Sequence, residues 1–83
     1  MRVLYFALVR QLVGRSEDTI EIPASVTTVG QLIDFLSQRD EGCAAAFADR
    51  RKLRAAVDKV HVSLDAPITG AREVAFFPPV TGG

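Results

Sequence analysis

The chain begins with an almost uninterrupted apolar stretch. Residues 3–8, Val-Leu-Tyr-Phe-Ala-Leu, place hydrophobic side chains on both alternating faces and include the β-branched and aromatic types that favour strands. This pattern predicts a central strand. Residues 18–22 alternate polar and apolar positions, and Pro23 then ends any hydrogen-bonded ladder. We therefore predict a half-buried second strand that pairs with the first as a hairpin.

The clearest periodicity of the chain follows these strands. Four apolar residues recur at the i, i+3, i+4, i+7 spacing of an amphipathic helix. They are Val29, Leu32, Ile33 and Leu36. Thr27 or Thr28 can cap this helix, because a hydroxyl oxygen accepts a hydrogen bond from a free backbone N–H of the first turn. Residues 43–49 are rich in alanine and predict a second, shorter helical piece.

The remaining apolar stretches are short and separated by turn residues. They predict three more strands, at residues 53–57, 60–64 and 73–77. One amphipathic helix can cover one face of a mixed sheet, so the compact solution is a two-layer α+β fold. The sequence therefore predicts a ubiquitin-like β-grasp domain over residues 1–77, with one main helix on one face of the sheet. An extended C-terminal tail is predicted over residues 78–83.

Length and composition limit the possible functions. A length of 83 residues suits one domain, and 48% hydrophobic against 24% charged residues can form a core without disulfides. Ten Lys and Arg balance ten Asp and Glu, so the basic excess typical of nucleic-acid binding is absent. The longest apolar run, residues 3–9, is far shorter than the roughly 20 residues of a membrane-spanning helix. We expect no nucleic-acid partner, no membrane anchor and no export signal.

Candidate catalytic and metal-binding residues are few. The chain has one cysteine, Cys43, and one histidine, His61, on different predicted elements. A lone cysteine in an alanine-rich helix is typical of a small buried residue, and it fits a reducing cytoplasm. His61 lies between two valines of a predicted strand, so it points to the opposite face and is expected to be exposed or at an interface. The acidic residues show no metal-ligand spacing, and we expect no metal site.

Phosphate-binding motifs are also missing from the sequence. Neither GxGxxG nor GxxxxGK[ST] occurs, so we expect the chain itself to bind no nucleotide or other cofactor. A basic run lies before the third predicted strand. The simplest interpretation of this run is a solvated connector, and the alternative is contact with an acidic partner surface. Its residues are Arg50, Arg51, Lys52 and Arg54.

The last six residues have the composition of a tail that enters another protein. Pro78 and Pro79 fix φ and favour an extended path away from the sheet. At roughly 3.3 to 3.6 Å per residue, such a tail reaches about 20 Å. Gly82 and Gly83 have no Cβ, so they can pass through a channel too narrow for other residues and deliver the terminal carboxylate of Gly83. The alternative is a frayed terminus without function.

Several stretches of the chain match a known pattern. Residues 53–57, residues 65–68 and above all residues 73–83, Glu-Val-Ala-Phe-Phe-Pro-Pro-Val-Thr-Gly-Gly, closely resemble the family of small subunits of molybdopterin synthase. Residues 3–12 are similar to the start of the same family, so the resemblance covers essentially the whole chain. All ubiquitin-like carriers share the Gly-Gly end, whereas the preceding Phe-Phe-Pro-Pro-Val is much more specific. Asp58 departs from the family, which often has Asn there.

The resemblance implies that the protein carries sulfur. In that family an ATP-dependent, E1-like activating enzyme adenylates the terminal glycine, here Gly83, and a sulfurtransferase system converts the adenylate to a thiocarboxylate. The thiocarboxylate enters the large subunit of the synthase, where its sulfur attacks a cyclic pyranopterin phosphate to build the molybdopterin dithiolene. The resemblance thus implies a heterotetramer with catalytic residues in the large subunit. The residues that would position the sulfur are Pro78, Pro79, Val80, Thr81 and Gly82.

Three other functions stay open at this point. One is sulfur donation to another pathway, such as thiazole or cysteine synthesis or tRNA thiolation. A second is a ubiquitin-like modifier that is joined through Gly83 to lysines of other proteins. The third is an interaction module with an inert tail, which would never be adenylated. The Phe-Phe-Pro-Pro motif favours the synthase subunit, and an end at Gly83 would need no processing protease.

The alternation of side chains also predicts a docking surface. The residues predicted to face the helix are Val3, Tyr5, Ala7, Val74 and Phe76. Those predicted to point away are Leu4, Phe6, Leu8, Ala75 and Phe77. We expect Phe6 and Phe77 to be the centre of a docking surface for the large subunit, with His61 at its border. The alternative is that the residues near Gln11 or Cys43 cover this apolar face and make it core.

Overall fold

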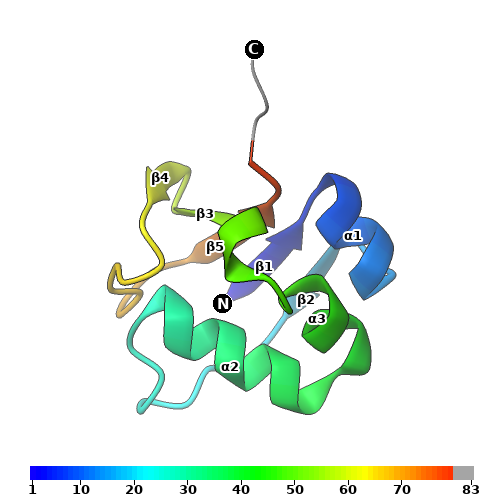
Figure 1. The fold of residues 1–83 in the computed structure, drawn as a ribbon. Coiled ribbons are helices and arrows are strands. Elements are labelled where there is room, and N and C mark those ends of the chain that lie inside the picture. The colour runs from blue at the N-terminus through cyan, green and yellow to red at the C-terminus, as the bar shows by residue number, and fades with distance from the viewer. Residues whose placement is uncertain (80–83) are drawn as a thin grey trace.

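A mixed sheet of five strands forms one layer of the protein in the computed structural model, which describes residues 1–79. The strands are β1 (Arg2–Tyr5), β2 (Glu17–Thr19), β3 (Arg54–Val57), β4 (Val60–Val62) and β5 (Glu73–Phe77). Their order in the sheet is β2-β1-β5-β3-β4 (Figure 1). β1 and β5 are parallel, and the other neighbouring pairs are antiparallel. β5 therefore lies in the middle of the sheet and leads directly to the C-terminal residues.

Helices form the second layer. They are α1 (Ala7–Val13), α2 (Val29–Arg39), α3 (Glu41–Ala46) and a 3₁₀ turn, η1 (Arg50–Lys52). α2 and α3 follow one another on the same side of the sheet (Figure 1). Thr28 caps α2 as predicted, because its Oγ1 accepts a hydrogen bond from the backbone N–H of Gln31 at 3.2 Å. The side chain of Gln31 in turn accepts a hydrogen bond from the backbone N–H of Thr27 at 2.7 Å. The backbone N–H groups of Thr27 and Gln31 therefore both have hydrogen-bond partners.

The core lies between α2 and the inner face of the sheet. The predicted helical stripe is fully buried, as are the inward-facing residues Val3 and Tyr5 of β1 and Val74 and Phe76 of β5. The ring of Phe76 contacts that of Phe47, with centroids 4.8 Å apart. Burial of these side chains supplies most of the stabilisation that a domain of this size can obtain. The predicted β-grasp architecture is confirmed.

The prediction for residues 6–8 was wrong. β1 ends at Tyr5, and α1 begins at Ala7, whose φ of 52° turns the chain out of the sheet. A continuous apolar run of this kind is compatible with a strand or a helix, and here tertiary packing decides, because α1 buries Val9 and Val13 one turn apart. Ala7 and Leu8 are therefore exposed helix residues, not strand residues. α1 also separates β1 from β2, which pair antiparallel as predicted but without a tight hairpin turn.

β2 covers only Glu17–Thr19 where residues 18–22 were predicted. The other predicted elements correspond closely to the structure. α3 covers Glu41–Ala46 where residues 43–49 were predicted to be helical, since Asp40 caps it through the backbone N–H of Cys43 at 3.0 Å. β3, β4 and β5 fall within or at the predicted strands. Asp58 has a φ of 47° in the turn between β3 and β4, a conformation that Asp and Asn tolerate better than most residues. Its Oδ1 accepts hydrogen bonds from the backbone N–H groups of Arg72 and Glu73.

A charged network connects α3 to the sheet. The guanidinium of Arg15 bridges Asp18 and Asp40, with N–O distances of 2.8 Å to each. The hydroxyl of Tyr5 donates a hydrogen bond to Asp18 at 2.8 Å. The Arg15 guanidinium lowers the pKa of Asp18, whereas burial raises the pKa of the Tyr5 hydroxyl. The carboxylate of Asp18 is thus held ionised and acts as the acceptor between these two donors.

α1 and α3 pack closely at Gly42. A Cβ built on Gly42 would lie 2.9 Å from the carbonyl oxygen of Val13 and 3.0 Å from that of Leu12. These are backbone oxygens of the last turn of α1, so they cannot move aside as the end of a side chain can. Gly42 is therefore required for the close approach of the two helices.

Gly42→Ala is expected to destabilise the protein. At an unhindered helix position, replacing Gly by Ala stabilises by roughly 0.5–1 kcal/mol. Here the steric overlap with the backbone of α1 outweighs this gain, since overpacking typically costs about 1–3 kcal/mol. We expect a net loss of about 1 kcal/mol or more in urea unfolding. Ala44→Gly, at an exposed position of the same helix, measures the helix-propensity difference between Ala and Gly, roughly 0.5–1 kcal/mol, that the overlap at Gly42 must exceed. A Gly42→Ala variant more stable than the wild-type protein would contradict the proposed packing constraint.

Candidate functional site

The middle strand ends at an exposed apolar surface. β5 ends at Phe77, and Pro78 follows without an N–H to continue the ladder. Phe77 pairs with Arg54 of β3, and the carbonyl of Phe76 accepts a hydrogen bond from the N–H of Phe6 at 3.0 Å. The backbone thus brings Phe6, at the end of β1, to the place where β5 ends.

Register places three of the predicted outward-facing residues, Leu4, Ala75 and Phe77, on the face of the sheet opposite the core. Leu4 of β1 pairs with Ala75 of β5, which pairs with Ala56 of β3, and these residues point away from α2. Ala75 is nevertheless only 8% exposed, because its side chain is short and lies on the middle strand of the sheet. We call this side of the sheet the open face. Its middle is a shallow surface of small side chains.

The large exposed hydrophobic side chains include four from α1, its N-cap and β4. They are Phe6, Leu8, Leu12 and Val60. Phe77 is half-buried at the end of β5. The sequence predicted Phe6 and Phe77 as the centre of a docking surface, and the structure brings them to the same end of the sheet. Their role in docking stays a prediction.

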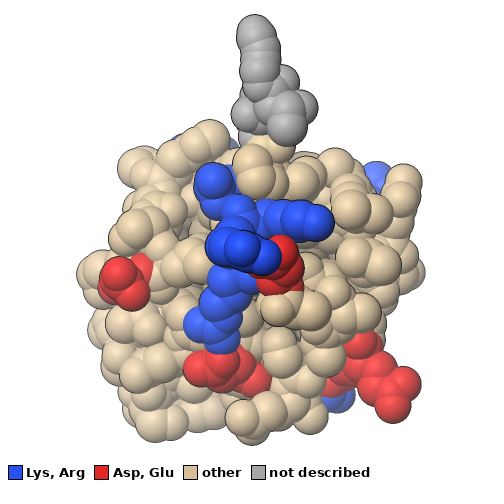
Figure 2. Space-filling model, viewed as in Figure 1, with Lys and Arg blue, Asp and Glu red and all other residues tan. Residues whose placement is uncertain are grey.

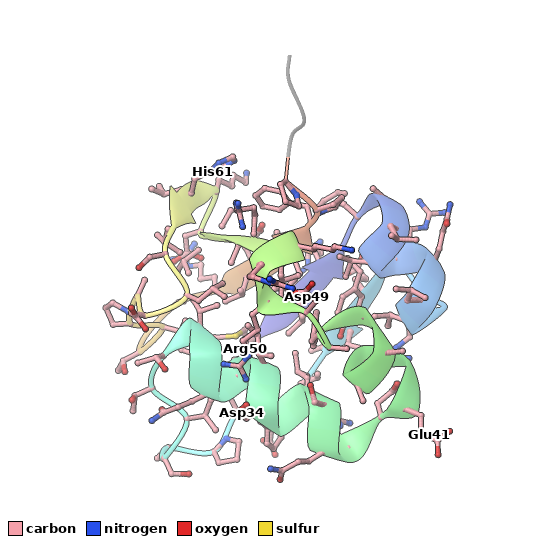
Figure 3. All side chains as sticks on the ribbon, in the orientation of Figure 1. Asp34, Glu41, Asp49, Arg50 and His61 are labelled. Atoms are coloured by element: carbon pink, nitrogen blue, oxygen red, sulfur yellow. The ribbon has the colours of Figure 1, made fainter. Side chains whose placement is uncertain are left out.

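His61 borders this surface. It pairs with Ala56 across β3 and β4, so it lies on the open face, and its side chain is exposed. The imidazole ring lies 5.0 Å from the ring of Phe77, centroid to centroid, in a tilted arrangement. Figure 3 shows His61 on β4 at the end of the molecule where β5 ends. The expected position of His61 beside Phe77 is thus observed, and a function for it in docking remains a prediction.

A groove beside the end of β5 was not predicted from the sequence. It has a volume of about 150 Å³ and is lined by Leu8 and Leu12 of α1, Ala45 of α3, Lys52 of η1, and Pro78. The i, i+4 spacing of Leu8 and Leu12 was the available signal, but Leu8 was assigned to the strand predicted over residues 3–8. The groove extends the exposed apolar surface from the sheet to the helices.

Cys43 and His61 form no catalytic pair. Cys43 is completely buried in the helix layer, where its sulfur lies 3.8 Å from the Tyr5 hydroxyl oxygen. Burial raises the pKa of the Cys43 thiol, which disfavours a reactive thiolate. His61 lies on the opposite side of the sheet. The interpretation of Cys43 as a buried helix residue is confirmed.

The described part of the chain has neither a cluster of metal-ligating side chains nor a long apolar helix. Among residues 1–79, no group of three or more His, Cys, Asp or Glu side chains is placed to hold a metal ion. The helices in this part of the chain are all too short to cross a membrane. The predicted carrier residues Val80, Thr81, Gly82 and Gly83 lie outside the residues that the structure describes.

A mixed sheet covered on one face by a capped helix, with its last strand in the middle, defines a ubiquitin-like β-grasp protein. Two solved structures support this class. SAMP1 from Haloferax volcanii has a TM-score of 0.73 at 22% identity and covers 99% of this chain and 97% of its own, which shows the fold alone. A Pyrococcus furiosus protein assigned as subunit 1 of a molybdopterin converting factor has a TM-score of 0.72 at 33% identity, covering 95% of both chains.

The chain belongs to the ThiS family, whose model matches residues 3–83. It is 47% identical over 83 residues to the molybdopterin synthase sulfur carrier subunit of Escherichia coli, covering 100% of this chain and 99% of the relative. It is 34% identical over 83 residues to the subunit of the same name from Haemophilus influenzae, with the same coverage. The resemblance seen in the sequence is therefore confirmed.

Proposed function

We propose that this protein is the sulfur carrier subunit of a molybdopterin synthase. The main support is the coincidence of two findings: full-length relatives carry that name, and the middle strand of the β-grasp sheet delivers the C-terminal residues at an exposed aromatic surface. A carrier needs both a reactive end that can enter another protein and a surface that docks beside it. The candidate site supplies the second of these features.

The chemistry of the proposed carrier begins at the carboxylate of Gly83. A carboxylate oxygen attacks the α-phosphate of ATP on a separate, E1-like activating enzyme, which releases pyrophosphate and leaves an acyl-adenylate. Sulfide supplied by a sulfurtransferase system then attacks the acyl carbon, displaces AMP and forms the thiocarboxylate. This order is necessary because a free carboxylate is a poor electrophile, and adenylation supplies the leaving group.

The thiocarboxylate would then act within the large subunit of the synthase. There its sulfur attacks a cyclic pyranopterin phosphate on the way to the dithiolene. Catalytic acids and bases would come from the large subunit, and this chain contributes the bound sulfur and its position. The docking surface around Phe6, Phe77 and His61 would hold the two subunits in register while Pro78 to Gly83 span the distance to the active site. The buried thiol of Cys43 is compatible with a cytoplasmic location.

The decisive experiment is intact mass spectrometry of the protein purified from its own host. The proposal predicts a fraction of molecules in which one terminal oxygen is replaced by sulfur, and transfer of this sulfur to cyclic pyranopterin phosphate when the large subunit is added. A loaded protein that fails with the large subunit would support another thiolation pathway. Attachment to lysines of other proteins without sulfur would support a modifier instead.

A further inference from the structure

The basic run of the sequence forms a distinct surface patch. Arg50, Arg51 and Lys52 make up η1, and Arg54 begins β3. In the orientation of Figure 1, Figure 2 shows Lys and Arg side chains gathered in a column over the position of η1 and toward the end of β5. The protein has no net charge, so this patch is a local concentration of positive charge and not part of a general excess.

Two of these cations are neutralised within the protein. Arg50 forms an ion pair with Asp34 of α2, and Figure 3 shows their side chains directed toward one another. Arg51 pairs with Asp49 at 3.1 Å. Within residues 1–79, Lys52 and Arg54 form no ion pair with a carboxylate.

Arg54 lies beside Phe77 at the end of β5, and Lys52 lies beside Pro78. Arg54 pairs in register with Phe77, so its side chain projects from the open face next to the last residue of β5. Its Nη1 donates hydrogen bonds to the carbonyl oxygens of Arg51 and Leu53 at 3.2 and 2.9 Å, which leaves the donors on Nη2 and Nε available. Lys52 lines the groove on the helix side, together with Pro78.

A protein that binds around Phe77 and Pro78 would also cover these two cations. Both adjoin the exposed apolar surface through which the chain leaves the sheet, and covering a cation without an opposite charge is costly because its hydration is lost. Carboxylates at the rim of the receiving pocket would remove this cost. They would also accelerate association, because complementary charges steer the encounter of two proteins.

We propose that Lys52 and Arg54 form a cationic collar that binds Asp or Glu side chains at the rim of the pocket in which the synthase large subunit receives the C-terminal residues. This inference rests on the proposed function, and it adds a specific charge pattern for the partner. The basic run is then an interaction surface, which was the less favoured of its two interpretations from the sequence.

The test is the association of the Lys52→Glu/Arg54→Glu variant with the large subunit, measured by stopped-flow or surface plasmon resonance over a range of salt concentrations. We expect the association rate at low salt to fall by about tenfold or more, because attraction becomes repulsion. The difference should shrink at high salt, where charges are screened. A neutral variant, Lys52→Gln/Arg54→Gln, should show a smaller loss in the same direction and serves if the charge-reversed variant folds poorly.

The matched control is Lys59→Glu/Arg72→Glu. This variant has the same change in net charge, but Lys59 and Arg72 are exposed at the opposite end of β5, beside Asp58 and Glu73. It should lower the association rate by less than about threefold. Equal rates and equal salt dependence in the two charge-reversed variants would overturn the collar. Sulfur transfer measured at a saturating concentration of the large subunit separates the two proposals. The Lys52→Glu/Arg54→Glu variant should retain sulfur transfer under these conditions. A wild-type protein that transfers no sulfur would count against the proposed function and not against the collar.

Discussion

Removal of Gly83, or of Gly82 and Gly83 together, is expected to abolish sulfur transfer and to leave the fold intact. The terminal carboxylate is the group proposed to be adenylated, and a shorter chain would place a different carboxylate short of both active sites. Near-attack geometry requires reacting atoms within about 3–3.5 Å, so the loss of one residue, about 3.3 to 3.6 Å of extended chain, is enough to prevent the reaction. The measurements are the synthase assay with the large subunit and circular dichroism.

Two further variants make this result specific. Thr81→Ser keeps the length of the chain and the glycines, so it should retain transfer. Addition of one residue after Gly83 should abolish it, because the carboxylate then belongs to another residue. The melting temperature should be the same in all of these variants, since the sheet ends at Phe77. Full activity of the truncated protein would rule out the carrier function.

Phe77→Ala is expected to weaken binding to the large subunit by about 2 kcal/mol or more, a factor of roughly 30 in Kd. The ring of Phe77 is half-buried, borders the exposed apolar surface and contacts the ring of His61. An aromatic side chain in this position loses its remaining contact with water when a partner covers it, which is how interface anchors contribute most of their energy. Binding is measured by calorimetry.

Phe76→Ala is the matched control for Phe77→Ala. Phe76 is the preceding residue of β5, points to the other face and is completely buried against Phe47. Its truncation should cost about 3–5 kcal/mol of stability. Phe77→Ala should cost no more than about 1 kcal/mol, which corresponds to a fall of roughly 4–8 °C in melting temperature. A large stability loss at Phe77 with unchanged affinity would place this residue in the core and contradict the docking surface.

Several features of the fold follow directly from local patterns in the sequence. The stripe from Val29 to Leu36 predicts α2 and its buried face, because a helix repeats every 3.6 residues and no strand can bury that spacing on one side. The alternation in β5 predicts that Phe76 is core and Phe77 is not, because successive side chains of a strand point to opposite faces. Short apolar stretches between turn residues predict β3 and β4 as well. The sheet and its open face could therefore both be predicted.

The start of α1 could not be predicted in this way. Residues 3–8 are apolar throughout, so neither the helical period of 3.6 residues nor the strand period of 2 residues is visible. The local sequence does not indicate the left-handed φ of Ala7. The same holds for Gly42, whose importance comes from carbonyl groups of another helix. Leu8 and Leu12 consequently line a groove whose only local signal, their i, i+4 spacing, could not be distinguished while Leu8 was assigned to a strand.

The sequence by itself determined the composition of the candidate site: an aromatic pair at the end of the last strand, two prolines, and a Gly-Gly end. Tertiary structure decided what surrounds it. Arg54 is distant from Phe77 in the chain, yet antiparallel pairing of β3 with β5 places them side by side. Lys52 of η1 and Pro78 come to line one groove together with residues of α1. Hydrophobic periodicity extends over a few neighbouring residues, so it can be recognised in the sequence. Strand pairing joins segments that are distant in the sequence and depends on the whole sheet.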